Sequence, residues 1–169
     1  AGEELALVGG PVRDAMLERG VPPVIEVPNG TSTHRLTAFC GQRDDSGPLG
    51  QVPVLILPDG TVLTESAAIV MHLANLAKPA KLAPDAGTPE HAQYLRLMLF
   101  LAANVYMTDL CWYYPHRMSI DPSVAPGIKA QSGIDQRRNW STLEGIAASG
   151  EALLPSGFSA ADIYLAMLV

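Results

Sequence analysis

The feature that most constrains this chain is a strand, turn, strand and helix in direct succession over residues 52–77. The apolar run Val52–Leu57 predicts a buried strand, and Pro58–Gly60 supplies turn chemistry. Thr61–Thr64 then predicts an antiparallel partner for that strand. The apolar residues of Ser66–Ala77 recur at helical spacing and indicate one buried face. A hairpin followed at once by an amphipathic helix favours an α/β layer.

The residues before this unit alternate between strand and helix patterns. The run Leu5–Val8 predicts a strand, Pro11–Gly20 a helix, and Val24–Val27 a second strand. Residues 28–51 are polar and rich in Gly and Pro, with a possible short helix around Leu36–Phe39. The predicted order is therefore β-α-β-α-β-β-α.

The second half of the chain reads as helix and loop. Residues 78–89 have the composition of a linker, and Thr88 is a suitable cap for a helix over Glu90–Tyr113. Prolines interrupt 115–127, and a further helix is expected over Ile128–Ala148. The first of these helices is apolar nearly all round, which indicates a subunit interface in addition to a core. We expect a homodimer.

We therefore expect two domains, an α/β domain over 1–77 and an all-α domain over 90–169, joined by the linker 78–89. The net charge of −6 and the scattered basic residues argue against nucleic-acid binding. The longest apolar run is too short to span a bilayer, so no membrane partner is expected. The histidines lack metal-ligand spacing, and no metal is expected. The two unpaired cysteines and the lack of a signal-peptide pattern favour the cytoplasm.

A helix-start signature stands near the end of the chain. Ser159 is a suitable N-cap, and Asp162, three residues later, completes a capping box. Phe158 and Ile163 are spaced as a hydrophobic staple. We expect these four residues to stabilise the fold without contacting a ligand, with Asp162 contributing less than Ser159.

Two stretches resemble the glutathione transferase family. The segment 48–55 together with 59–69 is similar to the family's glutathione-site core, and the cap and staple at 158–163 match a buried helix of its second domain. The resemblance implies a thioredoxin-like βαβαββα domain followed by a helical bundle. The family continues through further helices, so the all-α domain is expected to be incomplete after Val169.

The resemblance implies a glutathione site at Gln51, Val52, Glu65 and Ser66, with Pro53 in the cis form. Val52 would pair with the cysteinyl backbone, while Glu65 and Ser66 would meet the γ-glutamyl group at a helix N-terminus. Plainer interpretations stay open. Gln51 would then be an exposed amide, Val52 a core residue, and Ser66 or Thr64 a simple helix cap.

The family's first loop supplies a Tyr, Ser or Cys for the glutathione sulfur, whereas Val8–Val12 offers neither hydroxyl nor thiol. The catalytic residue is thus unknown, and Cys40 and Cys111 are interpreted as buried, inert thiols. The electrophile pocket is expected at Tyr106, Tyr113 and Arg117, although aromatic residues there also suit a core or an interface.

The function implied is a glutathione transferase that activates the thiol of glutathione, its co-substrate, for conjugation to small hydrophobic electrophiles in detoxification. A non-catalytic binding scaffold is the alternative, as is a glutathione-dependent peroxidase or isomerase on the same fold.

Overall fold

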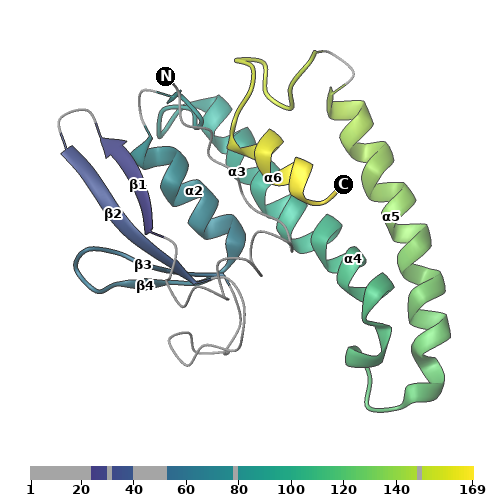
Figure 1. Cartoon of the computed structure of the whole chain (residues 1–169). Helices are drawn as coiled ribbons and strands as arrows, with labels where there is room; N and C mark the ends of the chain where they lie inside the picture. Colours follow the sequence, from purple (N-terminus) through teal and green to yellow (C-terminus); the bar gives the residue numbers. More distant parts are fainter. Residues whose placement is uncertain (1–23, 30–31, 40–52, 78–79, 148–149) are drawn as a thin grey trace. The chain divides into compact units, whose positions relative to one another are not determined.

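The computed structural model of this chain describes residues 24–29, 32–39, 53–77, 80–147 and 150–169. The chain divides into two compact units, Ala1–Lys81 and Leu82–Val169. In Figure 1, the sheet and helix α2 belong to the first unit and helices α3 to α6 to the second. The α/β plus all-α class that the sequence predicts is confirmed.

The first unit contains a four-stranded antiparallel sheet in the order β1-β2-β3-β4. Its strands are β1 (Val24–Asn29), β2 (Ser32–Phe39), β3 (Val54–Ile56) and β4 (Val62–Leu63). The register pairs Asn29 with Ser32 and Phe39 with Val54. The strands predicted around 24–27, 52–57 and 61–64 are present, whereas those before residue 24 lie outside the described residues.

The short helix predicted around Leu36–Phe39 is wrong, because these residues belong to strand β2. β2 pairs with β1 on one side and with β3 on the other, so ladder hydrogen bonds on both sides replace those of a helix. The sequence does carry a hairpin signal here: Asn29-Gly30 stands between two runs with strand character. The interpretation of 28–51 as a polar loop missed this hairpin signal.

The β3–β4 hairpin is closed by a three-residue loop whose chemistry follows the sequence. The Gly60 N–H donates to the Leu57 carbonyl at 2.9 Å, and Gly60 has φ 85°, which glycine adopts readily. The Thr61 N–H donates to Asp59 Oδ1 at 2.9 Å. The turn therefore returns the chain so that Leu55 pairs with Leu63.

Helix α2 (Ser66–Leu76) follows β4 and packs on the sheet through an apolar face. Leu55, Ile69 and Leu73 form the buried cluster between strand and helix. Their burial removes three large aliphatic side chains from water, worth about 1.5–3 kcal/mol each. The helix predicted over 66–77 is confirmed, and this packing fixes the start of α2 beside the end of β4.

The second unit is built from four α-helices and shorter turns among its described residues. They are α3 (Pro89–Phe100), α4 (Tyr106–Tyr113), α5 (Ala125–Ala147) and α6 (Ala160–Met167), with 3₁₀ turns η3 (Pro115–Arg117) and η4 (Pro122–Val124). Thr88 caps α3, accepting from the His91 N–H at 3.1 Å. α5 begins before the predicted Ile128, because Pro126 is tolerated in a first helical turn.

The helix predicted over 90–113 is continuous but not uniform. A π-helical segment, η2 (Leu101–Val105), joins α3 to α4. The Thr108 hydroxyl lies within hydrogen-bond distance of the carbonyls of Asn104 (3.0 Å) and Val105 (2.7 Å). Such wide turns often occur at functional sites.

One face of this long helix is buried and the opposite face is not. Tyr94, Leu97, Met98, Leu101 and Val105 are at most 2% exposed. Leu99 and Met107 are 61% and 42% exposed. Among the described residues, the Tyr94 hydroxyl is the one buried side-chain polar atom that lacks a hydrogen-bond partner. Burial raises the pKa of Tyr94 to about 12.

The start of α6 is tied down by the capping box. Ser159 Oγ accepts from the Ala161 N–H at 3.2 Å, and the Ser159 N–H donates to Asp162 Oδ2 at 2.8 Å. Asp162 also accepts from the Ser159 hydroxyl at 2.9 Å and from the Leu153 N–H at 2.8 Å. Phe158 is 65% exposed, so most of its ring lies outside the predicted staple. Its contact with Ile163 stays a prediction.

Candidate functional site at the start of helix α2

The first candidate site lies where the β3–β4 hairpin meets helix α2. β4 ends at Leu63, and α2 begins at Ser66. Because Leu55 pairs with Leu63 in antiparallel register, Pro53 and Glu65 lie at the same end of the hairpin. Gln51 and Val52, the other predicted glutathione ligands, lie outside the described residues.

The backbone at Glu65 is strained. Its φ is 66° and its ψ is 108°, in a region that side-chain-bearing residues rarely adopt. A conformation of this kind costs about 1–3 kcal/mol and persists only where surrounding structure imposes it. The buried contacts of β3 and α2 on either side provide that constraint. Such strain occurs preferentially at binding sites, which makes this exposed residue a candidate.

The first turn of α2 directly follows Glu65. Glu65 is the N-cap residue, and its side chain makes no capping hydrogen bond. The N-cap residue is therefore neither Thr64 nor Ser66, contrary to the plainer interpretation. The first-turn N–H groups carry a partial positive charge, to which anions bind. The geometry thus offers a carboxylate from Glu65 beside a cationic helix end, suited to a ligand with both charges.

The predicted electrophile residues belong to the other unit. Tyr106 and Tyr113 stand seven residues apart on α4, so they share one face of that helix, and are 39% and 70% exposed. The Arg117 guanidinium lies over the Tyr114 ring, 4.3 Å from its centroid. This cation–π contact holds the guanidinium beside an exposed phenol.

Trp112 differs from these neighbours because it packs on α5. A Cβ at Gly133 would meet the Trp112 ring at 3.0 Å, so this close approach depends on glycine. The Lys129 ammonium lies 4.7 Å from the same ring. Trp112 therefore joins α4 to α5, as the core interpretation of these aromatic residues expected.

Titratable groups give little further evidence of catalysis. Hydrogen bonds from Thr61 lower the pKa of exposed Asp59. Partial burial raises the pKa of Asp109, opposed by a hydrogen bond from Gln136 at 2.7 Å. Cys111 is partly exposed, while Cys40 and the loop Val8–Val12 lie outside the described residues. Across the described residues no group of three or more His, Cys, Asp or Glu side chains is arranged to hold a metal.

Sequence reasoning missed two features. The strain at Glu65 carries no compositional signal, because no glycine marks the position. A cavity between α4 and α5 was also missed, although the small residues Gly127 and Ser132 on α5 are a usable sign of it. Within the described ranges, no helix is long and apolar enough to cross a membrane.

Known proteins resemble this chain in sequence and in structure. Residues 12–76 match the family of glutathione S-transferase N-terminal domains. An uncharacterized GST-like protein, YncG, from Escherichia coli (strain K12) is 37% identical over 92 residues, which are 54% of this chain and 42% of that protein. A probable glutathione S-transferase, BZ2, from Zea mays is 34% identical over 98 residues, 56% of this chain and 39% of that protein.

A solved structure extends the likeness to the fold. A glutathione transferase homologue from Sulfitobacter, determined with bound glutathione, has a TM-score of 0.63 and 30% identity, covering 72% of this chain and 58% of that chain. This chain spans about two fifths of the length of the curated relatives it matches. The N-terminal match, the curated relatives and the shared fold agree on one conclusion: residues 12–76 are similar to the N-terminal domain of glutathione S-transferases, and the chain shares its fold with a glutathione transferase homologue.

Proposed function

We propose that this protein binds glutathione at Glu65 and Ser66 and conjugates it through its thiol sulfur to small hydrophobic electrophiles. The observation that carries the proposal is Glu65, an exposed acidic residue held at φ 66° directly before a helix whose first turn it does not cap. A γ-glutamyl group carries an ammonium and a carboxylate. Glu65 would accept from the ammonium, and the N–H groups at Ser66 would bind the carboxylate.

Pro53 and its neighbours would complete the site. The Sulfitobacter relative was solved with bound glutathione, which supports this ligand for a chain that shares its fold. In the proposed complex Pro53 is cis, Val52 pairs with the cysteinyl backbone, and Gln51 contacts the tripeptide. Tyr106, Tyr113 and Arg117 would contact the electrophile.

The proposed reaction joins the glutathione sulfur to an electrophilic carbon. The thiol loses its proton to solvent or a base, the thiolate attacks, and the electrophile's leaving group departs with its bonding electrons. Lowering a thiol pKa of about 8.5 by two units takes about 2.7 kcal/mol of preferential thiolate stabilisation.

Calorimetric titration with glutathione tests the binding step. Intact protein should bind with a dissociation constant of about 1 mM or lower, which is about −4 kcal/mol or stronger. Glu65→Gln keeps the size of the side chain and removes its charge, so binding should weaken about tenfold or more. Glu144→Gln, an exposed change on α5, is the matched control. Unchanged binding by Glu65→Gln, or no heat from intact protein at millimolar glutathione, would reject the proposal.

The transfer step needs its own assay. With glutathione and 1-chloro-2,4-dinitrobenzene, an active protein should form the thioether and release chloride faster than the buffer reaction. Glutathione binding without this acceleration would favour the second candidate, a non-catalytic binding protein. The sequence observation behind that candidate is the absence of any hydroxyl or thiol in Val8–Val12.

We also propose a cytoplasmic homodimer that serves detoxification. Leu95, Leu99 and Met107 are 38%, 61% and 42% exposed along α3 and α4, and a second copy would cover such apolar side chains. Sedimentation at micromolar concentration should give twice the chain mass of 17.9 kDa. A monomer at that concentration would contradict the proposed assembly.

A further inference from the structure

The 3₁₀ turn that follows α4 holds a cation against an aromatic ring. In η3 the Arg117 N–H donates to the Tyr114 carbonyl at 3.0 Å, and Pro115 fixes the backbone at the first position of the turn. A 3₁₀ helix has three residues per turn, so side chains three positions apart lie on the same side of it. The Arg117 guanidinium therefore lies over the Tyr114 ring, 4.3 Å from its centroid.

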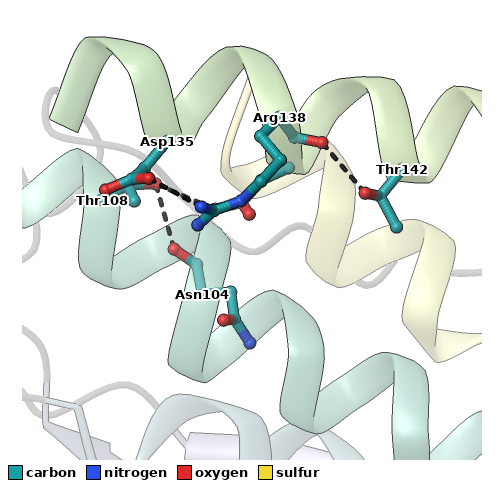
Figure 2. Close-up of polar contacts among 6 residues, drawn as sticks. Asn104, Thr108, Asp135, Arg138 and Thr142 are labelled. Atoms are coloured by element: carbon teal, nitrogen blue, oxygen red, sulfur yellow. Dashed lines mark hydrogen bonds and ion pairs between the residues drawn. The ribbon is translucent and has the colours of Figure 1, made fainter. Parts of the chain in front are cut away.

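Arg117 and Arg138 differ in the group that their charge meets. Arg138 Nη1 lies 3.0 Å from Asp135 Oδ1, and Figure 2 shows this pair on α5. Within the ranges that the structure describes, Arg117 forms no ion pair with a carboxylate, and its guanidinium contacts the Tyr114 ring instead. An aromatic face attracts a cation without removing its charge. The N–H donors of Arg117 are thus available to an anionic ligand.

The residues around this cation are exposed and aromatic. Tyr113 and Tyr114 are 70% and 41% exposed, and His116 and Arg117 are exposed as well. The His116 ring stands edge-on to Tyr114, with their centroids 6.3 Å apart. All four residues lie within Leu82–Val169. This surface offers a ligand both aromatic contact area and a guanidinium, which are the two groups that an aromatic acid needs.

A carboxylate is the anion that suits Arg117 best among those an aromatic molecule commonly carries. The planar guanidinium presents parallel N–H donors, which match the two oxygens of a carboxylate. The chain carries a net charge of −6, but charges beyond about 8 Å are largely screened at physiological ionic strength. The acidic residue nearest in sequence, Asp121, already accepts from the Ser123 N–H at 2.9 Å. The local cation therefore determines the charge preference.

We propose that Arg117 makes the electrophile site selective for aromatic electrophiles that carry a carboxylate, and that Tyr114 positions its guanidinium. This inference rests on the proposed transferase function and narrows its substrate class. The carboxylate accepts from Arg117 while the glutathione thiolate attacks the ring carbon that bears the leaving group. A carbon–sulfur bond forms, the carbon–halogen bond breaks, the halide leaves with the bonding electrons, and the thiol proton goes to solvent.

Two matched electrophiles test the charge preference. 4-Chloro-3,5-dinitrobenzoate and 4-chloro-3,5-dinitrobenzamide share a ring and a leaving group and differ in the carboxylate. Each kcat/KM is divided by the rate constant of the same electrophile with glutathione in buffer, which removes the difference in intrinsic reactivity. The benzoate should be favoured about fivefold, the range of an exposed charge pair. The preference should lie in KM, because the carboxylate contact is the same before and during attack.

The outcomes of this comparison separate the inference from the function on which it rests. Turnover of both electrophiles with equal normalised kcat/KM would overturn the charge preference and leave the transferase proposal standing. If neither electrophile, nor 1-chloro-2,4-dinitrobenzene, reacts faster than in buffer, the transferase proposal fails and the selectivity fails with it.

Arginine variants test whether Arg117 carries the preference. Arg117→Gln should reduce the benzoate-to-benzamide ratio to about one, whereas Arg117→Lys keeps the charge without the planar fork and should keep part of the preference. Arg137→Gln removes another exposed arginine of the same unit and is the matched control, which should keep the full ratio. An unchanged ratio in Arg117→Gln, or an equal loss in Arg137→Gln, would overturn the assignment.

Tyr114 is tested through the same ratio. Tyr114→Phe keeps the ring beneath the guanidinium and should keep the preference, whereas Tyr114→Leu removes the ring and should lower the ratio toward that of Arg117→Gln. A merely structural role would slow both electrophiles alike and leave the ratio unchanged. That result, or a Tyr114→Phe variant as impaired as Tyr114→Leu, would overturn the positioning role.

An unreactive pair of ligands provides a readout that does not depend on turnover. 3,5-Dinitrobenzoate and 3,5-dinitrobenzamide lack the leaving group, and calorimetric titration in saturating glutathione measures their binding. The benzoate should bind the intact protein about fivefold more tightly than the benzamide, and Arg117→Gln should remove the difference. Equal affinities in the intact protein, or a difference that persists in Arg117→Gln, would overturn the proposal.

Discussion

Helices α2 and α6 begin in opposite ways. At α6, Ser159 is 2% exposed and the Asp162 carboxylate accepts three hydrogen bonds. At α2, Glu65 is exposed, strained, and makes no side-chain cap bond. Both positions must satisfy the same unpaired N–H groups of a first helical turn. One start is capped by its own side chains, and at the other the N-cap side chain makes no cap hydrogen bond, which distinguishes a stabilising helix start from a candidate binding site.

The largest expected effect is the loss of Asp162. Asp162→Ala removes the acceptor for Ser159 and Leu153, so it should lower the free energy of unfolding by about 2–4 kcal/mol. Sequence reasoning ranked Asp162 below Ser159, and the extra bond to Leu153 reverses that expectation. Urea denaturation measures the change. Asp121→Ala, at an exposed cap with one bond to Ser123, is the control and should cost much less.

Ser159→Ala comes next. The change removes the oxygen that accepts from the Ala161 N–H, and the cap is buried, so the cost should be about 1–2 kcal/mol. Glutathione affinity of the folded protein should not change. A stable Ser159→Ala protein that no longer binds glutathione would make the α6 start a ligand site and abolish the contrast.

Glu65→Gly should change stability in the other direction. Glycine relieves a strain of about 1–3 kcal/mol but loses about 0.5–1 kcal/mol through backbone entropy, for a net gain of about 1 kcal/mol. The same variant should lose glutathione binding with the carboxylate. Lys81→Gly, at the other described non-glycine residue with positive φ, is the control for strain alone and should keep binding. A destabilised Glu65→Gly protein would mean that Glu65 stabilises the fold.

The smallest effect is expected at the exposed cap of α3. Thr88→Ala removes an acceptor for the His91 N–H, but water can replace it, so the cost should be about 0.5–1 kcal/mol. Thermal or urea melts of Thr88→Ala and Ser159→Ala, compared with each other, measure how much burial adds to the cost of losing a helix cap. Equal costs at the two caps would show that burial of Ser159 adds nothing.

The sequence predicted the elements whose signals are local. Pro58–Gly60 specifies its turn, and Ser159 with Asp162 specifies a helix start, because the interacting groups are within a few residues of each other. Strand β2 was missed although Asn29-Gly30 marks its turn from β1, because its pairing with β3 is not local and overrides the helical preference of Leu36–Phe39.

The candidate sites, too, could be predicted only as far as their signals are local in the sequence. Glu65 and Ser66 are proposed as site residues through resemblance, whereas the φ of Glu65 is imposed by packing and leaves no mark in the sequence. The cavity beside η2 depends on the spacing between two helices, which no single segment encodes. Only the small residues on α5 hint at it.

The unpartnered hydroxyl of Tyr94 has a consequence in alkaline solution. Burial raises the pKa of Tyr94 to about 12, whereas an exposed phenol ionises near pH 10. An unfolded chain therefore releases this proton first, and folding stability falls as the pH rises from about 10 toward 12. Tyr94 should therefore ionise only as the helical unit unfolds. Ultraviolet absorbance of the phenolate, followed beside circular dichroism, would show whether the two events coincide and locate the alkaline limit of the helical unit.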